Sequence, residues 1–275
     1  MSEWLVLAIV MAAACAVVLA VTLLNHRRHR TKTALAGNGD VDGGDGGGAR
    51  AGVETPDVLE YMTMMVGVVY AIVLGLAIAG VWEARSAAQD DARREAQALH
   101  EVVQRAEVFP SDFRAALRDD VDAYVSHVVG QEWPRMVEGR EVNGRGAELL
   151  AEVRSDVAQH TPANELEAHA YQPMLDQIAV ADAARNARVE SAGATLPGVV
   201  WFGLIAGALV TVGLIFTMNI GRSYQELLLA GFFSALIAFL LFLVWDFDAP
   251  FGRSGTDSAN VFRALFPAAS PPGTD

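Results

Sequence analysis

Hydrophobic residues are gathered into four uninterrupted blocks along this chain. The blocks cover residues 4–24, 61–82, 196–218 and 227–245, and none of them contains Asp, Glu, Lys, Arg or His. A helix rises about 1.5 Å per residue, so each block is long enough to cross the hydrocarbon core of a bilayer, which is about 30 Å thick. A charge near the centre of such a helix would cost at least about 2.5 kcal/mol. The pattern therefore predicts an all-α integral membrane protein with four transmembrane helices.

The segment between the second and third blocks has an amphipathic helical pattern instead. Stretches in which apolar residues recur every three or four positions are 99–109, 113–128 and 149–157. We expect the second transmembrane helix to continue beyond the membrane towards Pro110, and Ser111 to cap the helix that follows. A longer helix is expected over residues 163–191, interrupted by Pro173. Together these helices predict an antiparallel bundle without strands.

Hydropathy and composition divide the chain into eight segments. They are transmembrane helix 1–24, a flexible basic and Gly/Asp-rich linker 25–57, transmembrane helix 58–82, an acidic helical extramembrane domain 83–195, transmembrane helix 196–218, a short loop 219–226, transmembrane helix 227–247 and a C-terminal tail 248–275. The first block is expected to be a retained helix rather than a cleaved signal peptide. Residues 1–3 are acidic rather than basic, and the apolar stretch is longer than that of a signal peptide.

Aromatic and basic residues predict how the four helices are oriented. The expected interface anchors are Trp4, Trp82, Trp201 and Trp245, which alternating helices would place on one side of the membrane. The basic run His26–Arg30 follows the first helix on the other side, and such runs mark the cytoplasm. The chain is thus expected to be a multi-pass protein of the cell membrane, with both ends and the acidic domain outside. Asp246 and Asp248, at the end of the fourth helix, are expected to act as interfacial caps.

Charge and motif content exclude several classes of function. The formal net charge of −13 argues against nucleic-acid binding, which needs clustered cations. Cys15 is the only cysteine, so no internal disulfide forms. Asp40, Asp42 and Asp45 lie in the linker, but the spacing of a calcium-binding EF-hand would require a Glu where Ala51 stands. We expect no catalytic residue, no metal site, no cofactor and no enzymatic activity.

Small residues form stripes along the predicted transmembrane helices. Gly67, Ala71, Gly75 and Ala79 repeat at intervals of four along the second helix, and the third helix carries Gly203 and Gly207. In lipid, where packing replaces the hydrophobic effect between helices, small residues allow two backbones to approach closely. We predict a tight bundle and a homo-oligomer joined through the stripe of the second helix. The alternative is that this stripe packs only against the third helix of the same chain.

The run Glu132-Trp133-Pro134-Arg135-Met136, followed by Gly139, resembles the bestrophin-like family of bacterial membrane proteins, a domain of unknown function. Further parts of the resemblance are Val69-Tyr70, Trp82-Glu83, Leu196-Pro197, Val200-Trp201-Phe202, Gly207 with Thr211, Pro250-Phe251 and Phe262 with Ala264-Leu265. The resemblance covers about residues 58–266. Bestrophins are pentameric anion channels with four transmembrane helices and a helical domain, so the resemblance implies an oligomeric ion channel.

Two functions remain open from the sequence. The first is an oligomeric ion channel, and the second is a non-conducting sensor or scaffold whose acidic domain binds an envelope protein partner. Both place the chain in the lipid bilayer. For the Glu132-Trp133-Pro134 motif we predict a structural role: Pro134 should push Trp133 out of α geometry, end a helix and fix where the indole packs.

Overall fold

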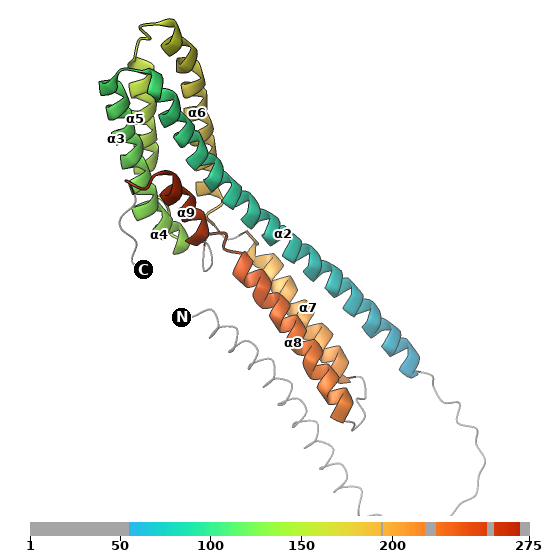
Figure 1. Ribbon diagram of the computed structural model, residues 1–275. Coiled ribbons are helices and arrows are strands. Elements are labelled where there is room, and N and C mark those ends of the chain that lie inside the picture. The colour runs from blue at the N-terminus through green and yellow to red at the C-terminus, as the bar shows by residue number, and fades with distance from the viewer. Residues whose placement is uncertain (1–54, 194, 218–223, 252–255, 270–275) are drawn as a thin grey trace, which may run out of the picture. The chain divides into compact units, whose positions relative to one another are not determined.

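The computed structural model describes residues 55–193, 195–217, 224–251 and 256–269, and within these ranges it contains helices and no strands. The helices are α2 (Thr55–Arg105), η1 (Ala106–Val108), α3 (Ser111–His127), the π-helical turn η2 (Val128–Glu132), α4 (Trp133–Val137), α5 (Arg145–Gln159), α6 (Glu165–Glu190), α7 (Gly198–Thr217), α8 (Tyr224–Phe247) and α9 (Thr256–Leu265). The all-α prediction is confirmed for these residues (Figure 1).

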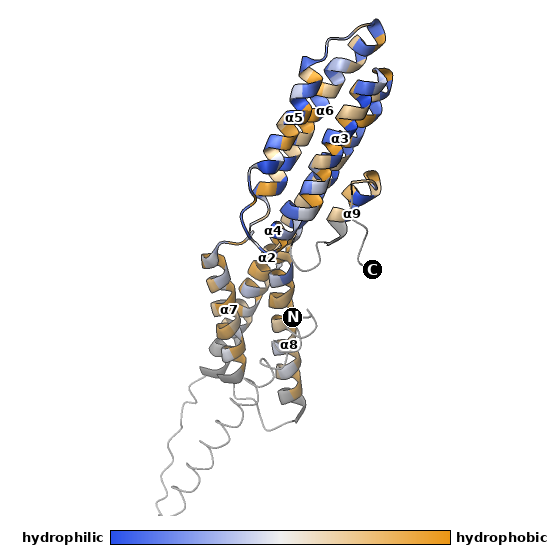
Figure 2. Cartoon of the chain, turned by 90° about the vertical axis from the view of Figure 1, so that its left-hand side faces the viewer, coloured by the Kyte–Doolittle hydropathy of each residue, from blue (hydrophilic) through white to orange (hydrophobic). Residues whose placement is uncertain are grey.

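Three helices, α2, α7 and α8, are long and apolar enough to cross a membrane. They contain the second, third and fourth predicted spans, whereas the first span, residues 1–24, lies outside the described residues. Figure 2 shows hydrophobic residues around α7 and α8, while hydrophilic and hydrophobic residues alternate around α3, α5 and α6. The expected continuation of the second span is confirmed, since α2 runs without a break to Arg105.

The chain forms two compact units, each of which has its own packing. The described part of the first, here called the membrane unit, comprises α2 as far as Ile78, α7, and α8 as far as Val244. The second, here called the helical domain, comprises the rest of α2 with α3 to α6, residues 191–197 and the C-terminal segment from Trp245. In the helical domain α3 packs on α5, and α5 packs on α6.

One apolar core holds the helical domain together. The predicted stripe of α5 supplies Leu150, Val153 and Val157, which are at most 2% exposed. The opposing stripe of α3 supplies Leu117 and Val121, which are at most 1% exposed. Burial of each such side chain contributes about 1.5–3 kcal/mol, so the amphipathic spacing accounts for the bundle.

Two local predictions were wrong. Pro173 does not interrupt α6, which continues through it from Glu165 to Glu190. The proline costs its helix about 3 kcal/mol, but Met174 and Ile178, which follow it, are fully buried and offset that cost. Ser111 makes no capping hydrogen bond, because its hydroxyl donates to Asp112 instead.

The C-terminal segment is part of the helical domain rather than a tail. Phe251 and Phe262 are 1% and 0% exposed in the same core as α3 and α5. The Ser126 hydroxyl donates a 2.7 Å hydrogen bond to the carbonyl of Ala269, which fixes the end of this segment against α3. This packing was not predicted from the sequence, because only ten residues, Thr256–Leu265, are helical there.

Candidate functional site

The Glu132-Trp133-Pro134 motif lies within a helix that changes its winding. The N–H of Trp133 bonds to the carbonyl of Val128, five residues earlier, which is the π-helical pattern. Trp133 itself has α-helical backbone angles, φ −57° and ψ −50°. The prediction that Pro134 ends a helix was therefore wrong. The wider π turn comes just before the proline, where a regular helix would lose a hydrogen bond and meet the ring, and the chain continues into α4.

Glu132 belongs to a buried network of charged side chains drawn from four helical elements. Arg188 of α6 donates from Nε to Glu95 Oε2 of α2 at 2.6 Å, and from Nη2 to Glu132 Oε2 at 2.9 Å. Arg185 donates from Nη2 to Glu132 Oε1 at 2.6 Å. The hydroxyl of Tyr124, on α3, donates to Glu95 Oε1 at 2.6 Å. Two carboxylates and two guanidiniums thus balance one another within the core.

Burial makes these interactions strong and costly at once. Glu95, Glu132 and Arg188 are 0% exposed. Burial opposes the charge of Arg188, but the attraction of Glu95, Tyr124 and Glu132 outweighs it and raises the pKa of Arg188 above its usual value. Burial and the neighbouring Glu95 raise the pKa of Tyr124 well above its usual value, so its hydroxyl keeps its proton. The network is therefore a water-excluded assembly in which two carboxylates pair with two guanidiniums.

The N-terminal turn of α5 must come very close to this network. A methyl group added at Gly146 would lie 2.1 Å from Glu132 Oε1 and 2.9 Å from Arg185 Nη2. Only a residue without a side chain leaves room there for the ion pair between Glu132 and Arg185. Gly146 is therefore part of the site.

The indole of Trp133 packs between the network and the C-terminal segment. It is 4% exposed, and the Arg188 guanidinium lies 5.8 Å from its ring centre. The Trp133 ring also contacts two phenylalanines edge-on. Its centre lies 5.3 Å from the ring centre of Phe251 and 6.3 Å from that of Phe262. Trp133 thus connects buried charges to buried aromatic rings.

The chemistry of this centre is that of a fixed polar core. Its carboxylates and guanidiniums bind each other and are closed to water. Within the described ranges no group of three or more His, Cys, Asp or Glu residues could hold a metal ion. The geometry fits a centre that fixes how four helical elements meet.

The small residues predicted on α2 and α7 separate into two environments. Ala71, Gly75 and Ala79 are exposed and Gly67 is half-buried, and a methyl group added at either glycine would meet no atom within 4 Å. Gly203 is likewise exposed and open. The stripe of α2 therefore faces away from α7 in the described part of the chain.

Gly207 lies in the seam between α2 and α7. The Tyr70 ring covers it so closely that an added methyl group would lie 2.6 Å from Tyr70 Cδ2. The Tyr70 hydroxyl donates a 3.2 Å hydrogen bond to the carbonyl of Leu204, one turn earlier on α7. Tyr70 and Leu74, 8% and 3% exposed, form the face of α2 that is buried within the unit.

Three of the predicted interface anchors lie in the described residues. Trp82 is 59% exposed, with its ring edge-on to Phe247 at 5.3 Å, and Trp201 and Trp245 are half-buried. Trp4 lies outside the described residues. Asp248 binds the backbone before α7 rather than standing alone as a cap, since its carboxylate accepts a 2.7 Å hydrogen bond from the N–H of Leu196.

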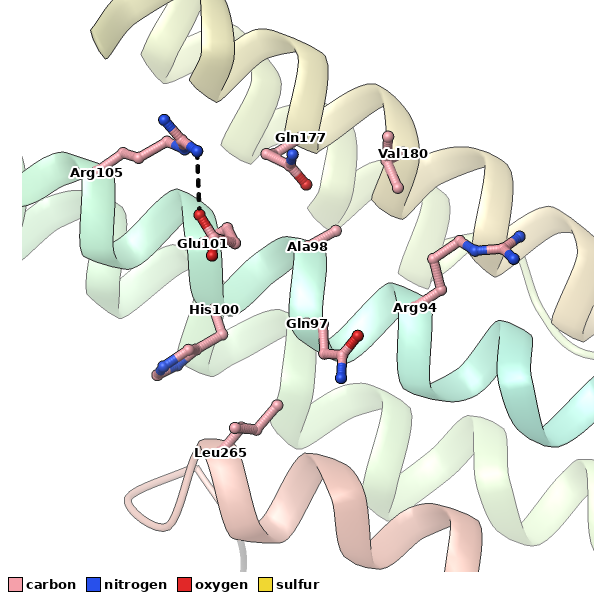
Figure 3. Close-up of a pocket in the computed structure, with 9 residues that line it drawn as sticks. All are labelled: Arg94, Gln97, Ala98, His100, Glu101, Arg105, Gln177, Val180 and Leu265. Atoms are coloured by element: carbon pink, nitrogen blue, oxygen red, sulfur yellow. Dashed lines mark ion pairs between the residues drawn. The ribbon is translucent and has the colours of Figure 1, made fainter.

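A surface hollow of about 610 Å³ lies along α2 in the helical domain. Figure 3 shows Gln177 and Val180 of α6 on one side of it and Leu265 of α9 on the other. Arg105 pairs with Glu101 at 3.2 Å, on the same helix. Arg94, at its other end, pairs with Asp91 at 3.5 Å.

The sequence of residues 40–255 matches the family model of the bestrophin-like domain. The chain belongs to the bestrophin-like family. The resemblance carried by the Glu132-Trp133-Pro134 run is thus confirmed. Among curated proteins, none matches the chain.

Solved structures show the same fold as this bestrophin-like chain. One is described as a membrane protein and carries a point mutation; it is 14% identical, with a TM-score of 0.62 over 77% of this chain and 87% of that one. Another is a mutant of a bacterial bestrophin homologue from Klebsiella pneumoniae; it is 13% identical, with a TM-score of 0.62 over 76% of this chain and 87% of that one. At such identities the likeness establishes the fold alone.

Most of the charged network of this bestrophin-like protein was not predicted from its sequence, although the sequence contains a signal for it. The buried stripe of α2 is Ala88, Ala92, Glu95, Leu99 and Val102, and that of α6 is Met174, Ile178, Ala181, Arg185 and Arg188. In each stripe the spacing alternates between four and three, as on one helix face. A charge at a position that this spacing assigns to the core predicts a buried partner of opposite charge.

Proposed function

We propose that this bestrophin-like protein is a multi-pass membrane protein that associates with copies of itself to form an ion channel. Family membership and the apolar helices α2, α7 and α8 support its place in a membrane. The observation that carries the proposal is the stripe Gly67, Ala71, Gly75 and Ala79, in which Gly67 is half-buried and the other three residues are exposed.

The stripe is suited to a second copy because α2 uses another face within its own chain. Tyr70 and Leu74 occupy the seam with α7, and the stripe lies beside them. In lipid, a strip of small residues gains van der Waals contact when another helix approaches closely. This arrangement favours the intersubunit alternative over packing against α7 of the same chain.

Conduction is the second part of the proposal. The blocks 61–82, 196–218 and 227–245 contain no charged residue, whereas a proton-coupled transporter would usually carry an ionisable group there. Several large side chains of α2 are exposed, including Met65 at 70% and Leu76 at 68%. Lipid, a neighbouring subunit or the wall of a pore would cover such surfaces.

Electrical recording tests conduction directly. Full-length protein in planar bilayers should give unitary currents, and Gly75→Leu, which places a side chain in the middle of the stripe, should abolish them. Gly213→Leu serves as the control, since Gly213 is also exposed on a transmembrane helix and open to an added methyl group, but lies outside the stripe. An oligomer that stays silent under all ionic conditions would reject the channel and favour the non-conducting sensor or scaffold.

Light scattering tests self-association independently. Wild-type protein extracted in mild detergent should be an oligomer, and Gly75→Leu should be a folded monomer. A wild-type chain that is monomeric in several detergents would reject the intersubunit role of the stripe. A Gly75→Leu protein that misfolds would instead support packing of the stripe within one chain.

The proposed orientation places the helical domain outside the cell. After replacement of Cys15 by Ala, a cysteine introduced at the exposed Ser155 of α5 should react with an impermeant thiol reagent in intact cells. A cysteine at Ser223, in the loop predicted on the other side, should react only after lysis. The opposite labelling pattern would place the helical domain in the cytoplasm.

A further inference from the structure

The residues that follow the fourth span are tied to the residues that precede the third. The carboxylate of Asp248 accepts a 2.7 Å hydrogen bond from the N–H of Leu196, and its backbone carbonyl accepts a 3.1 Å hydrogen bond from the N–H of Thr195. Leu196 lies two residues before α7 begins. The chain leaving α8 therefore fixes the position of the chain entering α7.

The same segment is tied to α2. The ring of Phe247 lies edge-on to Trp82 at 5.3 Å, and the guanidinium of Arg85 lies 5.1 Å from the Phe247 ring centre. Arg85 Nη1 is also 3.8 Å from Asp246 Oδ2. Residues 82, 85, 195–196 and 246–248 thus form one connected set of contacts, here called the span-end collar, in which segment 246–248 links α2 to the residues before α7.

A short connection leads from the span-end collar to the Glu132-Trp133-Pro134 motif. Phe251 lies three residues after Asp248, is 1% exposed, and places its ring edge-on to Trp133 at 5.3 Å. Pro250, between them, is also buried. Because Trp133 in turn contacts Arg188, packed groups connect the buried ion pairs to the span-end collar without a break.

We propose that the contact between Phe251 and Trp133 is a relay, through which the packing of the helical domain sets the geometry of the span-end collar and so controls opening of the channel. Close-packed interiors transmit strain, and the short segment from Asp248 to Phe251 is held at both ends. The proposal of channel control rests on the proposed function, whereas the mechanical coupling does not.

Hydrogen exchange in the full-length protein tests the coupling. Phe251→Ala should raise exchange at the amides of Thr195 and Leu196 by about tenfold, because loss of the ring loosens the segment that carries Asp248. Phe262→Ala is the matched control: Phe262 is also buried and also contacts Trp133, but lies well beyond the span-end collar in sequence. In Phe262→Ala, the exchange rates of the Thr195 and Leu196 amides should not rise more than that of the Val153 amide in α5, which serves as the internal reference.

Two outcomes would overturn the coupling. The first is an equal rise in the exchange rate at residues 195–196 in Phe251→Ala and Phe262→Ala, which would show a general loss of stability. The second is an exchange rate at these residues that stays at the wild-type value in both variants. Phe251→Leu, which keeps an apolar side chain, provides a variant more certain to fold. It should change the same two amides in the same direction by a smaller factor, and an unchanged pattern there would also reject the relay.

Single-channel recording tests the control of opening. Phe251→Ala should change the open probability at least about threefold while leaving the unitary conductance as in the wild type, since the ring lies in the helical domain. Altered exchange with an unaltered open probability would reject the regulatory role. If the wild type gives no current, the channel proposal fails, and the exchange experiment still decides whether the mechanical coupling exists.

Discussion

The helical domain and the membrane unit expose opposite kinds of side chain. In the helical domain, apolar residues are inside and surround a few fully buried charges, such as Glu95 and Arg188. In the membrane unit, large apolar residues such as Phe202 and Phe232 are 74% and 68% exposed. Its buried residues include the small Ala208 and Ala230. Each unit presents to its surroundings the surface that those surroundings solvate best, water in one case and lipid in the other.

The two units also satisfy buried polar groups in different ways. In the membrane unit, the hydroxyls of Thr211 and Ser234 each donate to the carbonyl one turn earlier in their own helix. They need no partner from another helix, so they do not determine which helices meet. In the helical domain Glu132 needs two arginines of α6, and a shift of one residue would separate them. Buried charges therefore fix the register of the helices in the helical domain, whereas the shapes of the side chains fix the packing of the membrane unit.

Removal of one buried charge should have the largest effect. Glu132→Ala would leave Arg185 and Arg188 with less negative charge in a water-excluded core, and should lower the free energy of unfolding by about 3–5 kcal/mol. Urea unfolding of the full-length protein, followed by circular dichroism, measures this loss. Glu138→Ala is the control, because Glu138 pairs with Arg140 at the surface and should change stability by less than about 0.5 kcal/mol. Similar losses in both variants would contradict a special role for burial.

Truncation of the buried indole should have the next largest effect. Trp133→Ala opens a cavity between Arg188 and Phe251 and should cost about 3 kcal/mol. Trp82→Ala removes the same group from a site that is 59% exposed and should leave the helical domain much less affected. Thermal unfolding of both proteins in detergent makes the comparison. A fully stable Trp133→Ala protein would point to a surface role for the motif instead.

The parts of the structure that follow from local pattern could be predicted from the sequence, and those that depend on pairing could not. The unbroken α2 and the buried stripe of α5 follow from periodicity alone. Glu95 and Arg188 are 93 residues apart, and no local pattern pairs them. The predictions for Pro134 and Pro173 failed for a different reason. Both prolines disfavour a continuous helix locally, but the π turn before Pro134 and the burial of the residues after Pro173 outweigh that preference.

Shape should matter more than charge in the membrane unit. Gly207→Ala would place a methyl group against the Tyr70 ring and should destabilise the seam between α2 and α7 by about 1–3 kcal/mol. Gly203→Ala, one turn earlier on α7, meets no atom and serves as the control. Thermal unfolding in detergent should show a lower transition temperature for Gly207→Ala alone. Equal temperatures for the two variants would mean that Tyr70 moves aside without cost.

The smallest predicted effect concerns a carboxylate at the surface between α3 and α5. Burial, followed by the hydrogen bond with Asp156 and the repulsion of Asp156, Glu152 and Asp119, raises the pKa of Asp120 from 3.8 to about 6. Because this pKa is raised on folding, the folded state holds its proton more tightly than the unfolded state does. The contribution of protonated Asp120 to the free energy of unfolding is therefore fully present below pH 3.8, and it is lost as the pH rises through about 6.

Asp120→Asn should consequently stabilise the protein at pH 7 and have little effect at pH 4. Water screens this partly exposed group, so we expect a gain of about 1 kcal/mol at pH 7 rather than the full value of the pKa difference. Urea unfolding at both pH values measures it, and Glu138→Gln, at a surface carboxylate outside this cluster, provides the control. A gain that is equal at pH 4 and pH 7 would show that the amide improves packing instead. A loss at pH 7 would show that the charge of Asp120 is favourable, and that α3 and α5 attract rather than repel each other at this point.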